Sequence, residues 1–417
     1  MTELKMLFEF DNPEDRVEEL SARIEPEVAD ILERALAGYE IGEKEGIALS
    51  GVQGDELAAL VATADFLRRK KIGDAVTYVV CRNINFTNVC YVGCKFCAFS
   101  TAPNRPDAWD YSLEEVAHRA EEAWDRGATE ICMQGGLPRD LSPYYYRDLL
   151  IAIKSRVPRI HIHAFSPMEI TYGLELTRMP VKEYLTMLRE AGLDSIPGTA
   201  AEILDDQVRM VLSKNKVSVA QWREVITNAH RLGIPTSSTM MYGHRENGTH
   251  WVRHLLLLRD IQKETGGFTE FVPLGFVHLN TALYAQGLAR PGPTPEEHIR
   301  LHALARVLLN DTIPNIQVSW VKMGRRMSQL CLRSGANDFG GTLMEESISR
   351  LAGSTEGEMM WPYEFRELIR DIDRTPAERS TCYRTLMAWP ASGILHRSAG
   401  RESQGYRGLE IREESEL

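Results

Sequence analysis

The chain has 417 residues, of which 43% are hydrophobic and 26% charged, as in a globular protein with one large domain or two smaller ones. Its formal net charge of −11 argues against a nucleic-acid-binding face, which needs clustered Lys and Arg, and favours a small-molecule substrate. The apolar runs are too short to span a bilayer, and no secretory signal is recognisable, so we expect a cytoplasmic protein without membrane contact.

The first 75 residues are predicted to form a helical extension outside the main domain. Apolar side chains recur at near-helical spacing over Pro26–Leu36 and again over Asp55–Arg68. Glycines between the two segments break the chain there: Gly42, Gly46, Gly51 and Gly54.

From residue 76 to residue 345, short apolar or β-branched runs alternate with helical stretches. About eight repeats of this alternation predict an α/β fold, a parallel sheet closed as a (β/α)8 TIM-type barrel. One helix is predicted over Ser112–Arg126, with a capping box formed by Ser112 and Glu115. The expected strands are Thr77–Phe86, Glu130–Gln134, Ile160–Phe165, Ser195–Gly198, Pro235–Tyr242, Glu270–Phe276, Ile316–Val321 and a weak one near Asn337.

Beyond the barrel, the sequence predicts a second helical extension over residues 346–391 and a flexible tail over residues 392–417. The tail mixes Gly, Ser and charged residues and lacks the apolar side chains that would dock it on a core. The predicted organisation is therefore a central barrel between two helical extensions.

Three cysteines lie close together after the first predicted strand. Cys90, Cys94 and Cys97 have the spacing C-x3-C-x2-C, and Phe96 precedes the third. Three thiolates in one loop cannot complete a tetrahedral zinc site, but they can bind three irons of a cubic [4Fe–4S] cluster. The fourth iron is then open to chelate a small molecule through an amine and a carboxylate. A chance grouping, or a zinc site with a distant fourth ligand, is the alternative.

The other cysteines are scattered: Cys81, Cys132, Cys331 and Cys382. A disulfide framework is typical of small secreted chains and does not suit one of this length. Positions as small apolar core residues are the simplest interpretation of these four. This use of cysteine fits a reducing cytoplasm, in which an iron–sulfur cluster survives best.

In a barrel of this type the active site lies at the C-terminal ends of the strands, where the cysteine loop also falls. Glycines and polar residues are expected at the ends of other strands as well. They are Gln134, Gly135 and Gly136 after the second strand, Ser166 and Glu169 after the third, Gly198, Thr199 and Glu202 after the fourth, Tyr242, Gly243, His244 and Glu246 after the fifth, and Asn337–Thr342 after the eighth.

These residues also have simpler structural interpretations. The pair Gly135–Gly136 could serve a tight turn with positive φ, and Glu202 could favour the first turn of the next helix. His244 could be an ordinary loop residue. His161 and His163 share one face of a strand, so they either point into the barrel, toward substrate or each other, or are satisfied interior residues.

The cysteine motif with Phe96 resembles the signature of radical S-adenosylmethionine (SAM) enzymes. Longer phrases between residues 50 and 390 resemble one group of these enzymes, the aminofutalosine and cyclic dehypoxanthine futalosine synthases and both halves of FO synthase. Within this group the sequence looks most like the FO synthase subunit two family, the 5-amino-6-(D-ribitylamino)uracil–L-tyrosine 4-hydroxyphenyl transferases. The phrases that carry this last resemblance are Ser195–Ala201, Gly340–Met344 and Glu346–Arg350.

The resemblance implies a radical SAM transferase of deazaflavin biosynthesis. In such enzymes a reduced [4Fe–4S] cluster cleaves SAM to methionine and a 5′-deoxyadenosyl radical, which abstracts hydrogen from the amine of tyrosine. A hydroxybenzyl-type fragment is then released and joins the ribitylaminouracil. The implied partners are these two small molecules, an electron donor such as flavodoxin or ferredoxin, and the second FO synthase subunit.

The resemblance also assigns roles to single residues. Cys90, Cys94 and Cys97 would be the cluster ligands, and Phe96 would lie near the adenine of SAM. Other SAM contacts are expected at Gln134, Gly135, Gly136, Glu202, His244 and Glu246. Substrate contacts are expected at His163, Ser166, Gln317, Ser319, Asn337, Asp338 and Thr342. No general acid or base is assigned.

Three stretches depart from the subunit-two pattern and leave the substrate open. Ser213–Lys216 replaces a Cys-Pro-Asp-Lys phrase, His278–Asn280 lacks an acidic residue, and Glu345 stands in place of an Asn. A paralogue acting on another aromatic substrate, or a futalosine enzyme of menaquinone biosynthesis, is therefore an alternative. A non-catalytic iron–sulfur or zinc module is a third reading, although it would not need polar and Gly-rich residues at so many strand ends.

Overall fold

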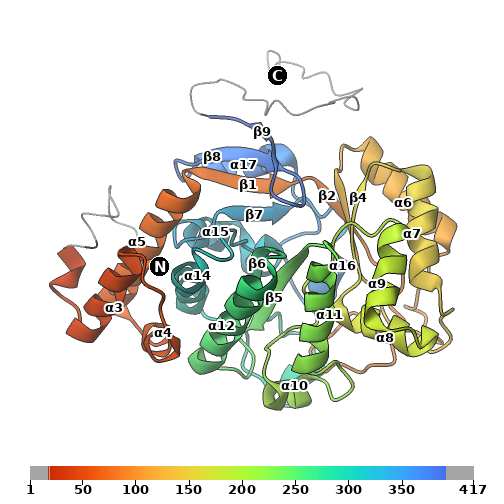
Figure 1. Ribbon diagram of the computed structural model, residues 1–417, viewed down its shortest axis with the longest axis horizontal. Helices are drawn as coiled ribbons and strands as arrows, with labels where there is room; N and C mark the ends of the chain where they lie inside the picture. The colour runs from red at the N-terminus through yellow and green to blue at the C-terminus, as the bar shows by residue number, and fades with distance from the viewer. Residues whose placement is uncertain (1–16, 18, 391–417) are drawn as a thin grey trace.

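The computed structural model describes residues 17 and 19–390, so the predicted tail over residues 392–417 lies outside the described residues. The N-terminal extension contains α3 (Pro26–Leu36), α4 (Glu43–Ser50) and α5 (Gly54–Ile72), and α3 and α5 confirm the helices predicted there. On the outside of the molecule, α4 and α5 pack against α12 (Gly248–Thr265) and α14 (Pro295–Leu309), and α3 packs against α4 and α5 (Figure 1). Hydrogen bonds from Arg259 to the Ile41 carbonyl and from Arg300 to the Val52 carbonyl, both 2.8 Å, fix this contact.

The centre of the molecule is a closed ring of parallel strands, which confirms the predicted barrel. Its regular strands are β1 (Ala75–Val79), β2 (Cys81–Ile84), β3 (Glu130–Met133), β4 (His161–Ala164), β5 (Thr236–Tyr242), β6 (Phe268–Gly275) and β7 (Asp338–Gly341). Parallel pairing joins β7 to β1, β2 to β3, β3 to β4 and β5 to β6. Single bridges at Ser195, Ile196, Ile316 and Gln317 close the two remaining gaps.

The strands differ from the prediction in detail. The first predicted strand, Thr77–Phe86, is divided into β1 and β2, because β1 pairs with β7 whereas β2 pairs with β3. The fourth and seventh barrel positions are reduced to single bridges, whereas the eighth, expected to be weak, is the regular strand β7. Strand pairing by neighbours, more than local composition, decides the length of each strand.

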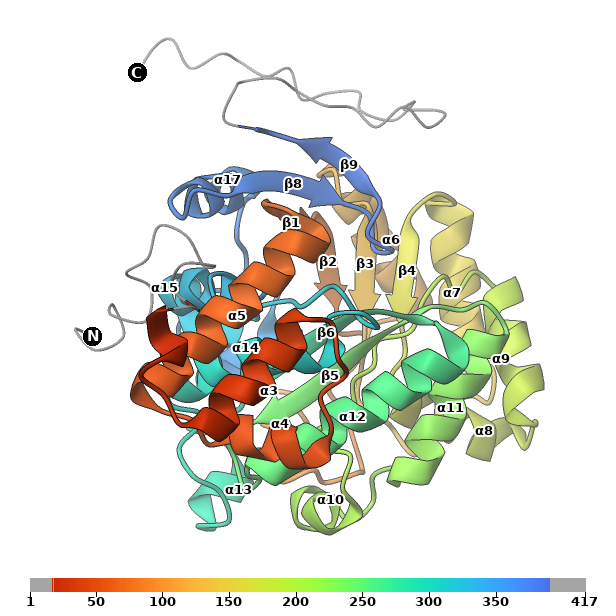
Figure 2. The same ribbon diagram turned by 60° about the vertical axis from the view of Figure 1, so that its left-hand side comes forward.

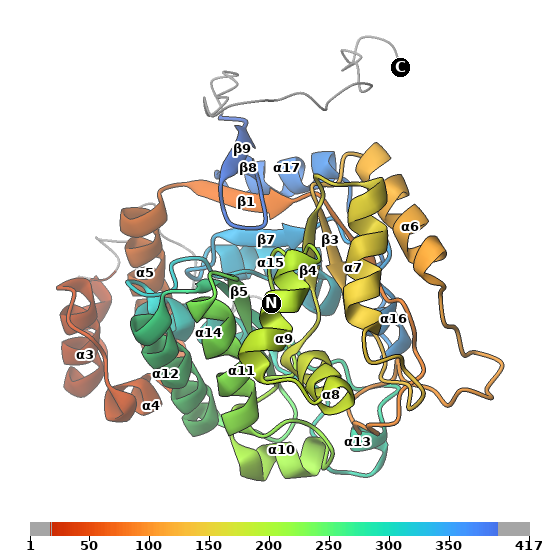
Figure 3. The same ribbon diagram turned by 45° about the vertical axis from the view of Figure 1, so that its right-hand side comes forward.

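Helices surround the ring and complete the βα units. They are α6 (Leu113–Asp125), α7 (Tyr145–Arg156), α8 (Pro167–Thr177), α9 (Val181–Glu190), α10 (Asp206–Leu212), α11 (Val219–Arg231), α12, α13 (Ala282–Ala285), α14 and α15 (Trp320–Leu332). Figure 3 shows α7, α9 and α11 as successive helices along the outside of the barrel, where they contact one another. The predicted capping box of α6 is present: the Ser112 hydroxyl accepts from the Glu115 amide, and the Glu115 carboxylate accepts from the Ser112 amide.

The C-terminal part contains helices and strands. Residues 346–391 were predicted to be helical, and α16 (Ser347–Leu351) and α17 (Pro362–Arg370) agree with this prediction. The prediction is wrong for β8 (Thr375–Arg379) and β9 (Thr385–Ala388), which form an antiparallel hairpin. Because β8 pairs in parallel with β1, the hairpin extends the barrel sheet. Figure 2 shows it lying across the starting ends of β2, β3 and β4.

The apolar core lies between the strands and the surrounding helices. An aromatic cluster of Phe86, Tyr146 and Phe165 illustrates this packing. The ring centroids of Tyr146 and Phe165 lie 4.6 Å apart, and those of Phe86 and Phe165 lie 6.3 Å apart. All three rings are almost completely buried. No helix among residues 17 and 19–390 is long and apolar enough to cross a membrane.

Candidate active site at the C-terminal ends of the barrel strands

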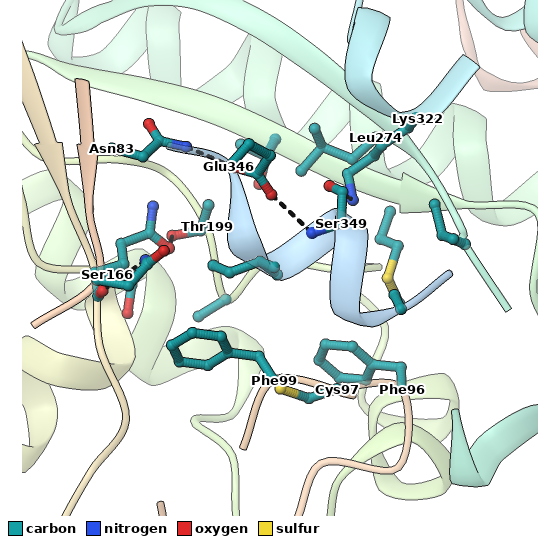
Figure 4. Close-up of a pocket in the computed structure, with 18 of the residues that line it drawn as sticks. Asn83, Phe96, Cys97, Phe99, Ser166, Thr199, Leu274, Lys322, Glu346 and Ser349 are labelled. Atoms are coloured by element: carbon teal, nitrogen blue, oxygen red, sulfur yellow. Dashed lines mark hydrogen bonds between the residues drawn. The ribbon is translucent and has the colours of Figure 1, made fainter. Parts of the chain in front are cut away.

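A cavity of about 400 Å³ lies at the C-terminal ends of the barrel strands. This volume falls in the range of small-molecule sites, roughly 300–1,000 Å³. Residues from the ends of most barrel strands line it, and Figure 4 shows part of the lining. Among the predicted site residues, the following reach the cavity: Cys90, Cys94, Phe96, Cys97, Gln134, Gly135, Gly136, Ser166, Glu202, Gln317 and Ser319.

The cysteine loop follows β2 and forms one wall of the cavity. Main-chain hydrogen bonds from Cys90 to Thr101 (3.1 Å) and from Lys95 to Leu212 (2.9 Å) tie the loop to neighbouring segments. The side chains of Cys90, Cys94 and Cys97 are half-buried and face the cavity. The loop therefore presents its three thiols on the same side.

The environment of the thiols fits an iron–sulfur cluster. Burial raises the pKa of Cys90 and raises that of Cys94 to about 11, and Lys216 acts against both shifts. Cys97 lies near enough to both thiols to disfavour their ionisation, so a positively charged group between the three is favourable. Among the described residues no three His, Cys, Asp or Glu side chains are arranged around one ion. A cubic cluster does not require that, because each thiolate binds a different iron.

The scattered cysteines follow the core interpretation only in part. Cys81 and Cys331 are buried, as expected, whereas Cys382 is exposed and Cys132 lines the cavity. The Cys132 sulfur accepts from the Gln134 side chain at 4.0 Å. For Cys382 the core interpretation is wrong, because its side chain is exposed in the turn between β8 and β9.

Glu202 belongs to a buried charge cluster beside the cysteine loop. Its carboxylate forms an ion pair with Lys216 and a longer one, 3.5 Å, with Arg209. The Lys216 ammonium lies 4.9 Å from the centre of the Phe96 ring, within the range of a cation–π contact. Glu202 does not cap the next helix, since Asp205 is the N-cap of α10. Glu202 and Phe96 thus share one wall of the cavity, and Lys216, which was not among the predicted residues, connects them.

The pair Gly135–Gly136 is required by close packing. Neither residue has a positive φ, so the tight-turn interpretation does not hold. A Cβ at Gly136 would lie 2.1 Å from the Val89 carbonyl oxygen, and one at Gly135 would lie 2.3 Å from the Phe86 ring. The Gly136 amide also donates to the Thr87 carbonyl at 2.7 Å. The glycines therefore let this strand end approach the cysteine loop, while both residues remain on the cavity wall.

Ser166 and Glu169 form the next part of the wall. Ser166 is the N-cap of α8, and its hydroxyl accepts from the Glu169 amide at 3.3 Å. The Glu169 carboxylate accepts from the amides of Gly135 (3.0 Å) and Ser166 (2.6 Å). Burial raises the pKa of Glu169 to about 7. Glu169 was expected at this strand end beside Ser166, but the sequence assigned it no role, and the structure places it on the cavity wall.

Several predicted substrate contacts lie elsewhere. Asn337 and Asp338 were expected to follow the eighth strand, but they stand at its beginning, at the opposite end of the barrel from the cavity. Asp338 forms an ion pair with Arg379, and Asn337 accepts from Arg306 at 2.9 Å. The Thr342 hydroxyl bonds the main chain of Cys81. None of these three side chains lines the cavity, so we assign none of them to substrate.

The predicted histidines and Glu246 are also occupied by structural contacts. His161 and His163 each bond the Ser195 hydroxyl at 2.7 Å, which makes them satisfied interior residues. His244 bonds the Met241 carbonyl at 2.9 Å, and Glu246 accepts from the amides of Gly243 and His244. The side chains of His244 and Glu246 have no exposed surface and do not line the cavity. They stabilise the loop after β5 and do not reach a ligand in the cavity.

A second polar group lines the cavity and was missing from the predicted site. It consists of Asn83, Lys322, Glu346 and Ser349, which come from β2, α15 and the start of α16 (Figure 4). Glu346 and Ser349 lie in the phrase Glu346–Arg350, which resembles the FO synthase subunit two family, but no spacing rule marked any of the four residues. Asn83 lies 263 positions before Glu346 along the chain, which explains why the sequence did not reveal the four residues as one group.

Comparisons with known proteins match the chain in two consecutive regions. Residues 84–258 match the radical SAM superfamily, and residues 265–390 match the CofH/MqnC C-terminal region. The 5-amino-6-(D-ribitylamino)uracil–L-tyrosine 4-hydroxyphenyl transferase of Methanopyrus kandleri is 49% identical over 360 residues, which are 86% of this chain and 97% of that protein. The chain belongs to the radical SAM family of this transferase. The predicted membership of the FO synthase subunit two family is thereby confirmed.

Other radical SAM proteins are similar over different extents. The FO synthase of Mycobacterium tuberculosis is 52% identical over 381 residues, which are 90% of this chain but 44% of that protein. The chain thus spans less than half the length of the FO synthases it matches. The crystal structure of HydG, a maturase of the [FeFe]-hydrogenase, has a TM-score of 0.68 at 14% identity, covering 89% of this chain and 80% of that one. At this identity the likeness confirms the radical SAM barrel fold and nothing more.

Proposed function

We propose that this chain is a radical SAM transferase that cleaves L-tyrosine and transfers its 4-hydroxybenzyl fragment to 5-amino-6-(D-ribitylamino)uracil, a step of deazaflavin biosynthesis. The observation that carries this proposal is a cavity with three thiols on one wall, in a chain that matches 97% of a transferase with these two substrates in its name. When bound, the cluster and SAM would supply a 5′-deoxyadenosyl radical.

The protein's own contribution is to hold the reactants and to exclude water. Cys90, Cys94 and Cys97 would hold the cluster, and the wall around Phe96, Gln134 and Glu202 would hold SAM. Gln317 and Ser319, which also line the cavity, are left for the two substrates. Apolar residues such as Met168, Leu274 and Phe276 complete the lining and offer few polar atoms near the radical.

Two of the three departures from the subunit-two pattern, Glu345 and His278–Asn280, lie outside this cavity, whereas Ser213–Lys216 borders the cysteine wall, where the Ser213 hydroxyl contacts the Cys94 sulfur at 3.3 Å. Glu345 pairs with Arg82 and Arg119, at 2.9 and 2.8 Å, and faces a separate, smaller pocket. Asn280 donates to the Leu351 carbonyl at 2.9 Å, and neither it nor His278 lines the main cavity. This arrangement supports tyrosine and ribitylaminouracil as the substrates over those of a paralogue or a futalosine enzyme.

The proposal includes an electron donor such as flavodoxin or ferredoxin, because cleavage of SAM needs one electron from outside the chain. It also includes a second protein that receives the product. The FO synthase of Mycobacterium tuberculosis matches this chain over 44% of its own length. The other FO synthase subunit would fill this role, in the cytoplasm, where reduced clusters persist.

The decisive experiment is a reconstituted reaction. The chain, loaded anaerobically with iron and sulfide, is incubated with reductant, SAM, L-tyrosine and ribitylaminouracil, and products are identified by mass spectrometry. The proposal expects 5′-deoxyadenosine together with a coupled product that carries the tyrosine-derived ring. Formation of 5′-deoxyadenosine without coupling would favour a paralogue with another substrate. One zinc per chain and no SAM cleavage would favour a non-catalytic module.

A further inference from the structure

A polar group lies across the cavity from the cysteine loop and is not used in the function proposed above. Lys322 is in the first turn of α15, Glu346 is the N-cap of α16, and Ser349 lies within α16. Figure 4 shows Glu346, Ser349 and Lys322 on the opposite side of the cavity from Phe96, Cys97 and Phe99. The ends of the seventh and eighth barrel strands thus bring one cation and one carboxylate to the same wall.

The Glu346 carboxylate is held in one orientation. One oxygen accepts from the Ser349 amide at 2.7 Å, and the other accepts from the Asn83 side chain at 2.6 Å. Only 6% of Glu346 is exposed, so its charge acts on the cavity and not on bulk water. Each carboxylate oxygen can accept a further hydrogen bond, and one from a ligand cation would add to the two present.

The Lys322 ammonium is less completely satisfied. It donates to the Ser349 hydroxyl at 3.1 Å, which leaves two of its three donors for other partners. Burial lowers the pKa of Lys322, while Glu346 acts in the opposite direction. Among the ion pairs of residues 17 and 19–390, none within 4.0 Å joins Lys322 to Glu346. Two opposite charges therefore share a wall without neutralising each other directly.

The other charged side chains on the cavity wall are engaged. Lys216 is paired with Glu202, and Glu169 accepts from two main-chain amides. Among the described residues that line the cavity, Lys322 is the cation that lacks a carboxylate partner. A ligand that carries both an anion and a cation a few ångströms apart would satisfy Lys322 and Glu346 together. The zwitterionic head of an α-amino acid has this chemistry.

We propose that Lys322 and Glu346 form the subsite for the head of the amino-acid substrate, with Lys322 binding its carboxylate and Glu346 its ammonium group. The identity of the amino acid as tyrosine rests on the proposed function. Asn83 and Ser349 position the two charged side chains. Holding both head groups fixes where the amine lies relative to the wall that would carry SAM, which is the kind of positioning that makes a reaction effectively intramolecular.

The test measures binding to cluster-loaded enzyme that holds SAM, without reductant, so that no SAM is cleaved. Three ligands are compared by equilibrium dialysis: L-tyrosine, tyramine, which lacks the carboxylate, and 3-(4-hydroxyphenyl)propionate, which lacks the amine. The wild-type enzyme should bind L-tyrosine about 10- to 100-fold more tightly than either analogue, as expected for one charged hydrogen-bonded contact. Iron content and SAM affinity serve as folding controls for every variant.

The wild-type enzyme should prefer L-tyrosine over tyramine and over 3-(4-hydroxyphenyl)propionate, and each variant should lose one of these two preferences and keep the other. Lys322→Met should bind L-tyrosine and tyramine about equally and still discriminate against the propionate. Glu346→Gln, which keeps the shape of the side chain, should show the reverse pattern. Lys182→Met, the same substitution at an exposed position of α9, should behave as wild type. If Lys322→Met fails to load iron, Lys322→Gln, which keeps a donor for Ser349, replaces it.

Undiminished preference for L-tyrosine over tyramine in the Lys322 variant would overturn the proposal. So would variants that weaken ribitylaminouracil binding and leave tyrosine binding intact. Failure of the proposed function is distinguishable, because the wild-type enzyme would then bind another amino acid in place of tyrosine. The same variants would then be compared with the amine and acid analogues of that amino acid. A wild-type enzyme that binds no amino acid would overturn both proposals.

Discussion

Single residues set the chemistry of the cysteine wall. Cys94 illustrates this: its sulfur contacts the Ser213 hydroxyl at 3.3 Å, and burial raises its pKa to about 11. Lys216 partly offsets the effect of burial, and it pairs with Glu202 on the same wall. Because only the thiolate is a metal ligand, cluster binding and deprotonation must occur together at this residue.

We expect Cys94→Ala to lose both bound iron and SAM cleavage. Two remaining thiolates cannot hold three irons of a cube and still leave the fourth for SAM. Iron per chain after anaerobic reconstitution and 5′-deoxyadenosine by chromatography measure the two losses. Cys382→Ser, at an exposed position away from the cavity, is the matched control and should retain both. Wild-type iron content in Cys94→Ala would show that the ligand assignment is wrong.

Gly136 provides a steric test of the same wall. A Cβ there would lie 2.1 Å from the Val89 carbonyl oxygen, so Gly136→Ala must displace the main chain of the cysteine loop. We expect destabilisation of about 1–3 kcal/mol, as for overpacking in other cores, and a lower iron content. Urea denaturation and iron analysis measure both. At Gly51 the nearest atom would be 3.8 Å away, so Gly51→Ala should change neither; equal behaviour of the two variants would contradict the steric argument.

At the residue scale the sequence predicted that the three cysteines lie at the C-terminal ends of the strands, and they line the cavity there, because their spacing is itself the signal. It failed at Asn337 and Asp338, because the strand begins there and does not end there, and this shift moves both residues to the far end of the barrel. It also missed Lys322 and Glu346, which only the closed ring brings to one wall. Positions defined by local spacing are predictable, whereas those defined by long-range pairing are not.

At the scale of elements, the amphipathic helices were the most predictable parts. The helix α6 follows its capping box and its apolar spacing, and it lies within one residue of the predicted range. The β8–β9 hairpin was not predictable, because its first strand contains Pro376 and the adjacent charged residues Glu378 and Arg379, which do not indicate a strand. Pairing with β1 and an ion pair between Arg379 and Asp338 hold it in place.

The ion pair between Arg379 and Asp338 should be essential for docking of the hairpin. Both side chains are almost fully buried, and Arg379 also approaches Glu270 at 3.7 Å. Arg379→Met would leave the Asp338 carboxylate buried without its partner, which costs about 3–5 kcal/mol in comparable cases. The free energy of unfolding in urea measures the loss. The double variant Arg379→Met with Asp338→Asn should recover part of it, and purely additive effects would contradict a direct interaction.

At the scale of the whole molecule, the two ends of the barrel differ in structure: one end holds the cavity, and the other is covered by the β8–β9 hairpin. The C-terminal ends of the strands surround the cavity, whereas the hairpin crosses the other end, where Glu270, Asp338 and Arg379 are buried together (Figure 2). Ligand chemistry is thus confined to one end. The end that the hairpin covers carries a titratable group that should make the stability of the fold depend on pH.

Glu270 is the group that should produce this dependence. Burial raises its pKa to about 7, against an ordinary value of 4.5, although Arg379 acts in the opposite direction. The folded chain therefore keeps a proton on Glu270 that the unfolded chain has lost between these two pH values. Its contribution to stability is fully present below pH 4.5 and is lost as the pH rises through about 7.

We expect the wild-type chain to lose stability relative to Glu270→Gln as the pH rises from 5 to about 8, because the amide mimics the protonated acid at every pH. The slope for one proton is at most about 1.4 kcal/mol per pH unit. Urea midpoints of the cluster-free chain measure it, since loss of a cluster would make unfolding irreversible. Glu169, whose pKa burial also raises to about 7, adds a dependence of the same sign to both proteins and cancels in the difference. If the stability of the two proteins changes with pH in the same way, Glu270 is already ionised in the folded chain. The effect of Arg379 on the pKa of Glu270 would then outweigh the effect of burial.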